Sequence, residues 1–292
     1  MAEVLDKKKI RKVFRDVQKH LAIAQLIRRF STNKEDIRKT ALKQVDLSNC
    51  RNILELGCAF GAFTEALKDK LHQDATITGI DIIPEYKPFF LEACRRAGYS
   101  GLFSSSSIDR IKKYPDCSFD LVICSYALYF FADMIPEIAR VLKKDGHFIT
   151  ITHSRVNIRE IVGIVKNILK QNNLHHDNQA LPIEIIFEQF SAENGATLLH
   201  PFFRRIQEID FKNTLVFQPE EINHFLDYFQ FKKSFFLSGT DAHNKTIINQ
   251  LTRELQDSAM KNNLVTMCKD DKIFICSHPV EHPPTGAGGS LE

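Results

Sequence analysis

The stretch Asn52-Ile-Leu-Glu-Leu-Gly-Cys-Ala-Phe-Gly-Ala-Phe-Thr64 decides the fold of this chain. Its first part predicts a short apolar strand ending at Leu56, followed by a turn of small residues and the start of a helix. Gly57 and Gly61 allow the backbone to turn sharply and a ligand to come close, whereas Ala59 stands where a middle glycine is common. In an α/β sheet, such a turn presents backbone N–H groups to a ligand.

Strands and helices alternate from this stretch as far as His153, which predicts a parallel sheet covered on both faces. The expected strands are 52–56, 76–80, 101–103, 119–124 and 147–153, and the expected helices are 85–97 and 133–142. After His153 the regular alternation of strands and helices ends. Helices are expected near 158–169, 219–228 and 245–260, and strands at 206–209, 214–217 and 272–276.

The N-terminal part predicts one long amphipathic helix from Ile10 to about Ala24, with a face rich in Lys and Arg. That basic face is either simply solvated or a contact for an acidic partner or RNA. The stretch Ser31-Thr-Asn-Lys-Glu35 is typical of a helix N-cap with an acid placed to complete a capping box, and it predicts a second helix toward Val45.

Composition narrows the class of protein. The 292 residues are 43% hydrophobic and 26% charged, which is typical of a soluble globular protein. No apolar run is long enough to span a bilayer, and the charged N-terminus argues against export, so a cytoplasmic protein is expected. Seven cysteines without a C-x-x-C pair favour reduced thiols and argue against a disulfide framework or a metal site. The net charge of +3 does not by itself imply nucleic acid.

Two acidic residues suggest the ligand. Asp81 lies at the end of the second strand, 20 residues beyond Gly61, where a carboxylate can bind the hydroxyls of a ribose; the alternative is a helix cap. Glu55 lies before the turn, where it would repel the pyrophosphate of a nicotinamide cofactor. The charge therefore favours a cationic nucleoside, S-adenosylmethionine, over a dinucleotide.

Residues 52–153 resemble the class I S-adenosylmethionine-dependent methyltransferases, particularly the type 11 group. Glu55-Leu-Gly-Cys-Ala-Phe-Gly61 is similar to the first motif of that family, with Ala59 at the middle glycine. Cys117-Ser-Phe-Asp-Leu-Val-Ile-Cys124 is similar to its "SFDLV" strand, and Leu142-Lys-Lys-Asp-Gly146 to its "LKPGG" turn. These motifs span about a third of the chain.

The resemblance implies a Rossmann-like, doubly wound sheet of seven strands, mostly parallel with an antiparallel last strand, and a helical cap insertion. The expected parts are an N-terminal helical segment at 1–50, a donor-binding core at 51–153, a cap and substrate region with a sixth strand at 154–270, a last strand at 271–279 and a tail or linker at 280–292.

It also implies the donor contacts. Asp81 matches the acid that binds the ribose, and Ile82 the neighbour that packs on adenine. The family often has Asp at the adenine edge, where this chain departs with a run of serines, so Ser106 or Ser107 is expected to contact the base; a serine-rich loop without a ligand is the alternative. The expected set for S-adenosylmethionine, and for its product S-adenosylhomocysteine, is Glu55, Gly57, Cys58, Ala59, Gly61, Asp81, Ile82, Ser106, Ser107, Ile108, Cys124, Ser125 and Tyr126.

Methyl transfer mainly needs an aligned and desolvated nucleophile, with a base where a proton must leave. His153, at the end of the fifth strand, is the candidate base, and Tyr129 a second catalytic candidate; a structural histidine that caps the next helix is the alternative. No metal is expected.

The acceptor is less defined by the sequence. No Asn/Asp-Pro-Pro-Tyr/Phe motif is present and no Pro-Cys follows the fourth strand, which favours a small molecule over nucleic acid, methylated on O or N. An aromatic cluster at 225–236 is either core or the wall of a site for an apolar acceptor. RNA methylation and a non-catalytic donor-binding subunit are the alternatives. No membrane contact is expected, and the chain is expected to be a monomer or homodimer.

Overall fold

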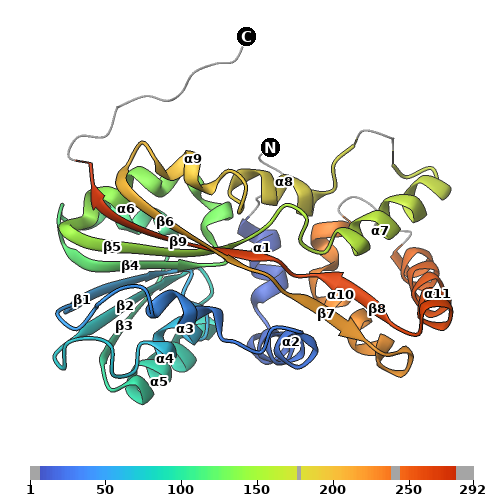
Figure 1. Ribbon diagram of the computed structural model, residues 1–292, viewed down its shortest axis with the longest axis horizontal. Helices are drawn as coiled ribbons and strands as arrows, with labels where there is room; N and C mark the ends of the chain where they lie inside the picture. The colour runs from blue at the N-terminus through green and yellow to red at the C-terminus, as the bar shows by residue number, and fades with distance from the viewer. Residues whose placement is uncertain (1–6, 176–178, 238–243, 281–292) are drawn as a thin grey trace, which may run out of the picture. The chain divides into compact units, whose positions relative to one another are not determined.

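A computed structural model describes residues 7–175, 179–237 and 244–280 (Figure 1). The chain forms two compact units, each made of three stretches of sequence. We call Met1–Glu35, His153–Gln189 and Phe211–Asp271 the helical unit, and Asp36–Thr152, Phe190–Asp210 and Lys272–Glu292 the sheet unit. Of the expected tail at 280–292, all but Val280 lies outside the described residues.

A seven-stranded, mostly parallel sheet forms the centre of the sheet unit, with the last strand antiparallel, as predicted. In sheet order its strands are β3 (Ser100–Ser105), β2 (Thr76–Asp81), β1 (Asn52–Leu56), β4 (Phe119–Ser125), β5 (Leu142–His153), β9 (Asp271–Pro279) and β6 (Phe203–Phe211). The chain starts in the middle at β1, runs outward through β2 and β3, and returns to β4 on the other side of β1. This reversal is the switch point at which open α/β sheets bind their ligands.

Register brings the carboxyl ends of the strands together at this point. Leu56 of β1 pairs with Ile80 of β2 and with Cys124 of β4, and Asp81 pairs with Ser105 of β3. The apolar strands are buried because helices cover both faces of the sheet. Figure 1 shows α3 (Ile37–Leu42), α4 (Ala62–Ala66) and α5 (Lys87–Ala97) on one face, and α6 (Ile135–Val141) and α9 (Gly195–Leu199) on the other.

Short 3₁₀ helices occupy several of the connections. In chain order they are η1 (Pro84–Tyr86), η2 (Ile108–Lys113), η3 (Leu128–Phe130), η4 (Ala132–Met134) and, in the helical unit, η5 (Pro219–Glu221).

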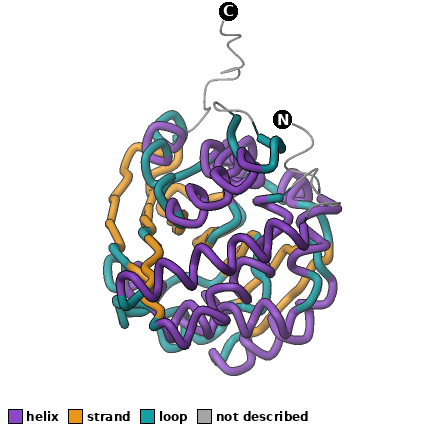
Figure 2. Tube along the Cα trace, turned by 90° about the vertical axis from the view of Figure 1, so that its right-hand side faces the viewer, coloured by secondary structure: helices purple, strands orange, loops and turns teal. Residues whose placement is uncertain are grey.

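Helices make up most of the helical unit (purple in Figure 2). They are α1 (Lys7–Phe14), α2 (Val17–Phe30), α7 (Arg159–Gln171), α8 (Pro182–Gln189), α10 (Ile222–Phe236) and α11 (Asn244–Asn262). A two-stranded antiparallel sheet of β7 (Thr214–Phe217) and β8 (Val265–Cys268) completes the unit. Helix α10 contacts α1, α2, α8 and α11, so its phenylalanines form the core of the unit. None of the described helices is long and apolar enough to cross a membrane.

Two expectations for the N-terminal part are wrong. The single first helix is divided into α1 and α2, because Asp16 leaves the helical conformation and its carboxylate accepts a hydrogen bond from the Lys19 amide at 3.0 Å. Ser31 ends α2 instead of opening a capping box, and Asp36 is the residue that caps α3, through the Arg38 amide at 3.0 Å.

The helix expected over 133–142 is also shorter than predicted. Helix α6 ends at Val141, and β5 begins at once with Leu142, which pairs with Phe119 of β4. Lys143 donates a hydrogen bond to the Asp120 carboxylate at 2.7 Å, which holds this first part of β5 against β4.

Asp120 joins three strands and provides a test of the sheet. Its carboxylate also accepts the amides of Arg51, just before β1, and of Asn52, the first residue of β1, at 3.0 and 2.8 Å. Burial alone would raise the pKa of Asp120, but Lys143 and the two amides lower it below its ordinary value. The stabilisation is therefore present at neutral pH and is lost as the pH falls through this lowered pKa.

We expect Asp120→Ala to lower the free energy of unfolding by about 1–3 kcal/mol at pH 7, because it leaves the two amides without their acceptor. Urea denaturation measures this change. The exposed Asp145→Ala serves as the matched control and should change the free energy by less than about 0.5 kcal/mol. Equal effects of the two substitutions would contradict the role given to Asp120.

Candidate active site

The turn after β1 has the backbone that its small residues predict. Gly57, Ala59 and Gly61 all have positive φ, at 65°, 43° and 79°. The Gly57 amide donates to the Ile80 carbonyl of β2 at 2.8 Å, which ties the turn to the neighbouring strand. A Cβ atom on Gly57 would lie 2.7 Å from the Cβ of Ala127, so the segment after β4 approaches this turn closely. Ala59 adopts a conformation that is unfavourable for a residue with a side chain.

Asp81 holds Ala59 in that conformation. One carboxylate oxygen accepts the Ala59 amide at 3.0 Å and the other accepts the Ile83 amide at 2.9 Å. Only 7% of the residue is exposed, and burial raises its pKa to about 6, against the opposing effect of the amides of Ile83, Ala59 and Ile82. The group is therefore mostly ionised at pH 7, and its oxygens keep lone pairs that a ligand hydroxyl can use.

Glu55 lies deeper than its place before the turn suggests. It is 3% exposed, and its carboxylate accepts the Thr64 hydroxyl of α4 at 2.5 Å. Burial raises the pKa of Glu55 to about 7, while the Thr64 hydrogen bond and the charge of Arg38 oppose the rise. Glu55 therefore braces the first turn of α4 and carries a partial negative charge at neutral pH.

Arg38 is a residue of this site that sequence reasoning missed. It lies on α3 and makes two hydrogen bonds to the Asp36 carboxylate, at 2.8 and 3.0 Å. The positive charge of Arg38 opposes the rise in the pKa of Glu55, and Arg38 also interacts electrostatically with Tyr126. No local pattern marks this arginine, because its partners lie far along the chain.

The end of β3 distinguishes the two serines expected near adenine. The Ser106 amide donates to the Asp81 carbonyl at 3.0 Å, and the Ser106 hydroxyl is 3.0 Å from that of Ser104. The Ser107 hydroxyl donates to Asp109 at 2.6 Å instead. The side chain of Ile82 is half-buried, and Ile108 is 9% exposed.

The end of β4 contributes the other residues of the expected set. Ser125 and Tyr126 are half-buried, and Tyr126 has a φ of 57° with its amide bound to the Ile151 carbonyl of β5 at 2.9 Å. Tyr129 is 5% exposed, and its ring packs edge-on against Phe130. The thiols of Cys58 and Cys124 are buried with raised pKa values, which makes both side chains unreactive.

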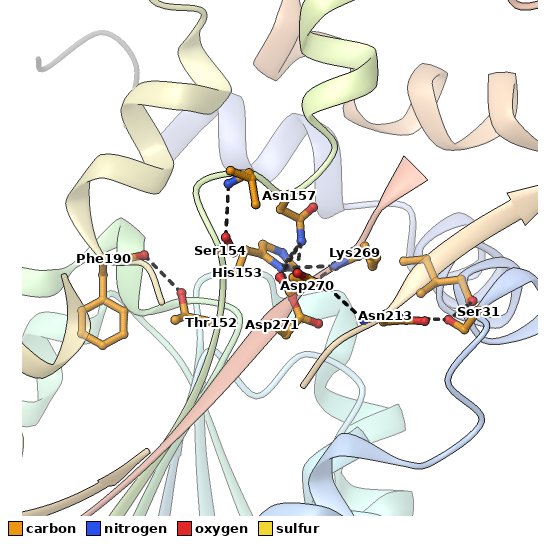
Figure 3. Close-up of polar contacts among 12 residues, drawn as sticks. Ser31, Thr152, His153, Ser154, Asn157, Phe190, Asn213, Lys269, Asp270 and Asp271 are labelled. Carbon is orange, nitrogen blue, oxygen red and sulfur yellow. Dashed lines mark hydrogen bonds and ion pairs between the residues drawn. The ribbon is translucent and has the colours of Figure 1, made fainter. Parts of the chain in front are cut away.

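His153 ends β5 and belongs to the helical unit, where Figure 3 shows it among polar side chains. Its Nδ1 atom lies 2.7 Å from the Asp271 carboxylate, 3.1 Å from the Asn157 amide nitrogen and 3.2 Å from the Lys269 ammonium. Burial and the charge of Lys269 lower the pKa of His153 to about 4, although Asp271 acts in the opposite direction. The imidazole is therefore neutral at pH 7.

A wider hydrogen-bond network joins the three stretches of the helical unit around His153 (Figure 3). The Asp270 carbonyl accepts the Ser154 amide at 3.0 Å, and the Asp270 carboxylate accepts the Asn213 amide at 3.0 Å. The Asn213 side chain then donates to the Ser31 hydroxyl at 2.9 Å. The ends of β5, β9 and α2 are thus fixed to one another within this unit.

The contact between Gly57 and Ala127 gives a test of the site geometry. We expect Gly57→Ala to destabilise the protein by about 1–3 kcal/mol, because the new methyl group clashes and the residue has a left-handed conformation. In the double variant Gly57→Ala/Ala127→Gly the clash disappears, so a positive coupling energy is expected in urea denaturation. Strictly additive effects would show that the two residues do not touch.

Comparison with known proteins bears on the same segment. The model of the Methyltransferase domain family, Methyltransf_11, matches residues 54–150. The uncharacterized methyltransferase YcgJ of Bacillus subtilis is 26% identical over 119 residues, which cover 37% of this chain and 44% of that protein. The uncharacterized methyltransferase C70.08c of Schizosaccharomyces pombe is 26% identical over 141 residues, covering 46% of this chain and 52% of that protein. The chain thus spans about half the length of the curated relatives it matches.

A solved structure shares the fold. A protein of Bacillus halodurans, solved as a candidate methyltransferase, superposes with a TM-score of 0.50 at 13% sequence identity, over 84% of this chain and all of that chain. The sheet order, the turn after β1 and the family match agree with one another. Residues 54–150 therefore match the methyltransferase-domain family, and the fold and the relatives support a class I S-adenosylmethionine-dependent methyltransferase.

Proposed function

We propose that this protein transfers a methyl group from S-adenosylmethionine to an oxygen or nitrogen atom of a small-molecule acceptor. The observation that carries the proposal is the ionised Asp81, which two backbone amides hold at the switch point of the sheet. A carboxylate fixed there suits the paired hydroxyls of a ribose.

The residues around Asp81 fit the rest of the donor. The half-buried Ile82 offers an apolar surface for adenine, and the Ser106 hydroxyl can bond the base edge. Within the turn from Gly57 to Gly61, the two glycines and Ala59 leave room for a ligand to come close to the backbone. We assign the half-buried Ser125 and Tyr126 to the methionine part. The negative charge of Asp81 and the partial charge of Glu55 favour a cationic donor over a pyrophosphate.

S-adenosylmethionine supplies an electrophilic methyl group on a good leaving group, so the protein mainly has to position and desolvate the acceptor. We assign His153 to the acceptor. Asp271, by holding Nδ1 at 2.7 Å, fixes the orientation of the ring. A histidine with a pKa of about 4 accepts hydrogen bonds throughout the neutral range, but it is a weak base. It therefore orients a hydroxyl or amine, and Tyr129 is a second positioning group.

The donor assignment is tested by calorimetry with S-adenosylmethionine and S-adenosylhomocysteine. We expect both compounds to bind. Asp81→Ala should lower the affinity for each by at least about tenfold, because the ribose hydroxyls lose their charged hydrogen-bond acceptor. The exposed Asp145→Ala should bind like the unaltered protein. Binding of NAD in place of both nucleosides would refute the methyltransferase proposal.

The role of His153 is tested on turnover, followed as S-adenosylhomocysteine release with a panel of small hydroxyl- and amine-bearing acceptors. We expect His153→Ala to lower kcat by about a hundredfold and to leave donor affinity unchanged. Activity should fall with acid only as the pH approaches 4, since the neutral ring is present above its pKa. The control is the exposed His200→Ala.

Full turnover of His153→Ala would remove this residue from the mechanism. The panel also includes RNA, because α1 carries Lys or Arg at most of its positions. Donor binding without release of product on any acceptor would favour a non-catalytic subunit.

A further inference from the structure

Lys232 is an unusual lysine in the helical unit. It lies on α10 and is half-buried, and its ammonium nitrogen faces three phenylalanine rings. The nitrogen is 5.1 Å from the ring centroid of Phe14, 5.9 Å from that of Phe231 and 5.7 Å from that of Phe235. The ring of His20 stacks on Phe231 at 5.5 Å and completes this surface, which we call the Lys232 surface.

Lys232 has no acidic partner in the described part of the chain. Within residues 7–175, 179–237 and 244–280, no hydrogen bond or ion pair joins its ammonium to a carboxylate. Burial lowers the pKa of Lys232 to about 7, and the positive charge of the Lys269 ammonium contributes to this shift. Two lysines therefore oppose each other in a part of the unit where water is largely excluded.

The neighbouring polar groups do not supply the missing negative charge. Asp271 lies 3.5 Å from the Lys269 ammonium and 2.7 Å from His153, so its charge is already shared. His20 and His153 are neutral at pH 7, with pKa values lowered by burial to about 3 and about 4. The local balance is an excess of positive charge.

A purely structural role fits these observations poorly. A lysine that only covers apolar surface extends its ammonium into water, where its pKa stays ordinary. Lys232 instead holds its ammonium over ring faces beside a second cation. Cation–π contacts offset part of the lost hydration, but they leave the charge uncompensated.

We propose that the Lys232 surface binds a carboxylate attached to an apolar or aromatic body. The carboxylate pairs with the Lys232 ammonium, and the body packs against the half-buried ring of Phe14, which the buried rings of Phe231 and Phe235 support. A monoanion matches a single compact ammonium, whereas a phosphate dianion would need more donors than this surface offers. This carboxylate site does not rest on the proposed methyltransferase function.

The test is calorimetry on the full chain with phenylacetate and with the neutral phenylacetamide, which has the same body. We expect phenylacetate to bind at least about tenfold more tightly than the amide, because only the carboxylate pairs with the ammonium. Lys232→Met should reduce the affinity for phenylacetate to that for phenylacetamide. Lys232→Arg should restore much of the difference in affinity between the two compounds. The adjacent Lys233→Met on α10 is the matched control and should bind like the unaltered protein.

Equal affinity for the two compounds, no binding of either, or undiminished phenylacetate binding by Lys232→Met would overturn the proposal. Displacement of phenylacetate by stoichiometric inorganic phosphate would overturn the choice of a carboxylate. If Lys232→Met does not fold, Lys232→Gln takes its place. S-adenosylmethionine is titrated into the same variants, so that loss of the carboxylate site and failure of the methyltransferase proposal give different results.

Discussion

The carboxylate of Asp81 is the group on which the rest of the site depends. By accepting the amides of Ala59 and Ile83, it joins the turn after β1 to the residues after β2. Pairing of Leu56 with Ile80 makes this short bridge possible, because it brings the two strands to the same level. The amides offset much of the cost of burying the charge. The contact that gives the turn its shape thus also keeps an ionised acceptor at the ligand edge of the sheet.

The two units differ in the groups that surround their charged side chains. In the sheet unit, Asp120 and Asp81 are both compensated by backbone amides, and their charges serve the architecture. In the helical unit, Lys269 has Asp271 beside it, whereas the described neighbours of the Lys232 ammonium are aromatic rings and another cation. A charge compensated by its own chain is part of the scaffold, whereas a charge without compensation favours an external partner.

The sequence predicts most of the sheet because its strands are apolar runs that end at small or acidic residues. The turn at Gly57 follows from residue type alone, as does the place of Asp81. Contacts between distant segments could not be predicted in this way. Arg38 acts on Glu55 across a long stretch of chain, and the lowered pKa of His153 depends on Lys269, far along the sequence. The division of the first helix was missed for a local reason, since the apolar stripe continues past Asp16 although its side chain caps a new helix.

The position of β9 has a consequence for synthesis on the ribosome. This strand comes after all the other strands of the large sheet in the chain, yet it lies between β5 and β6. When those two strands leave the exit tunnel, the strand that separates them has not been made. Until β9 has been made, the backbone hydrogen-bonding groups at that edge of β5 stay unpaired or form a non-native pairing with β6. The nascent chain is therefore most exposed to misfolding and to chaperone capture just before its final strand emerges.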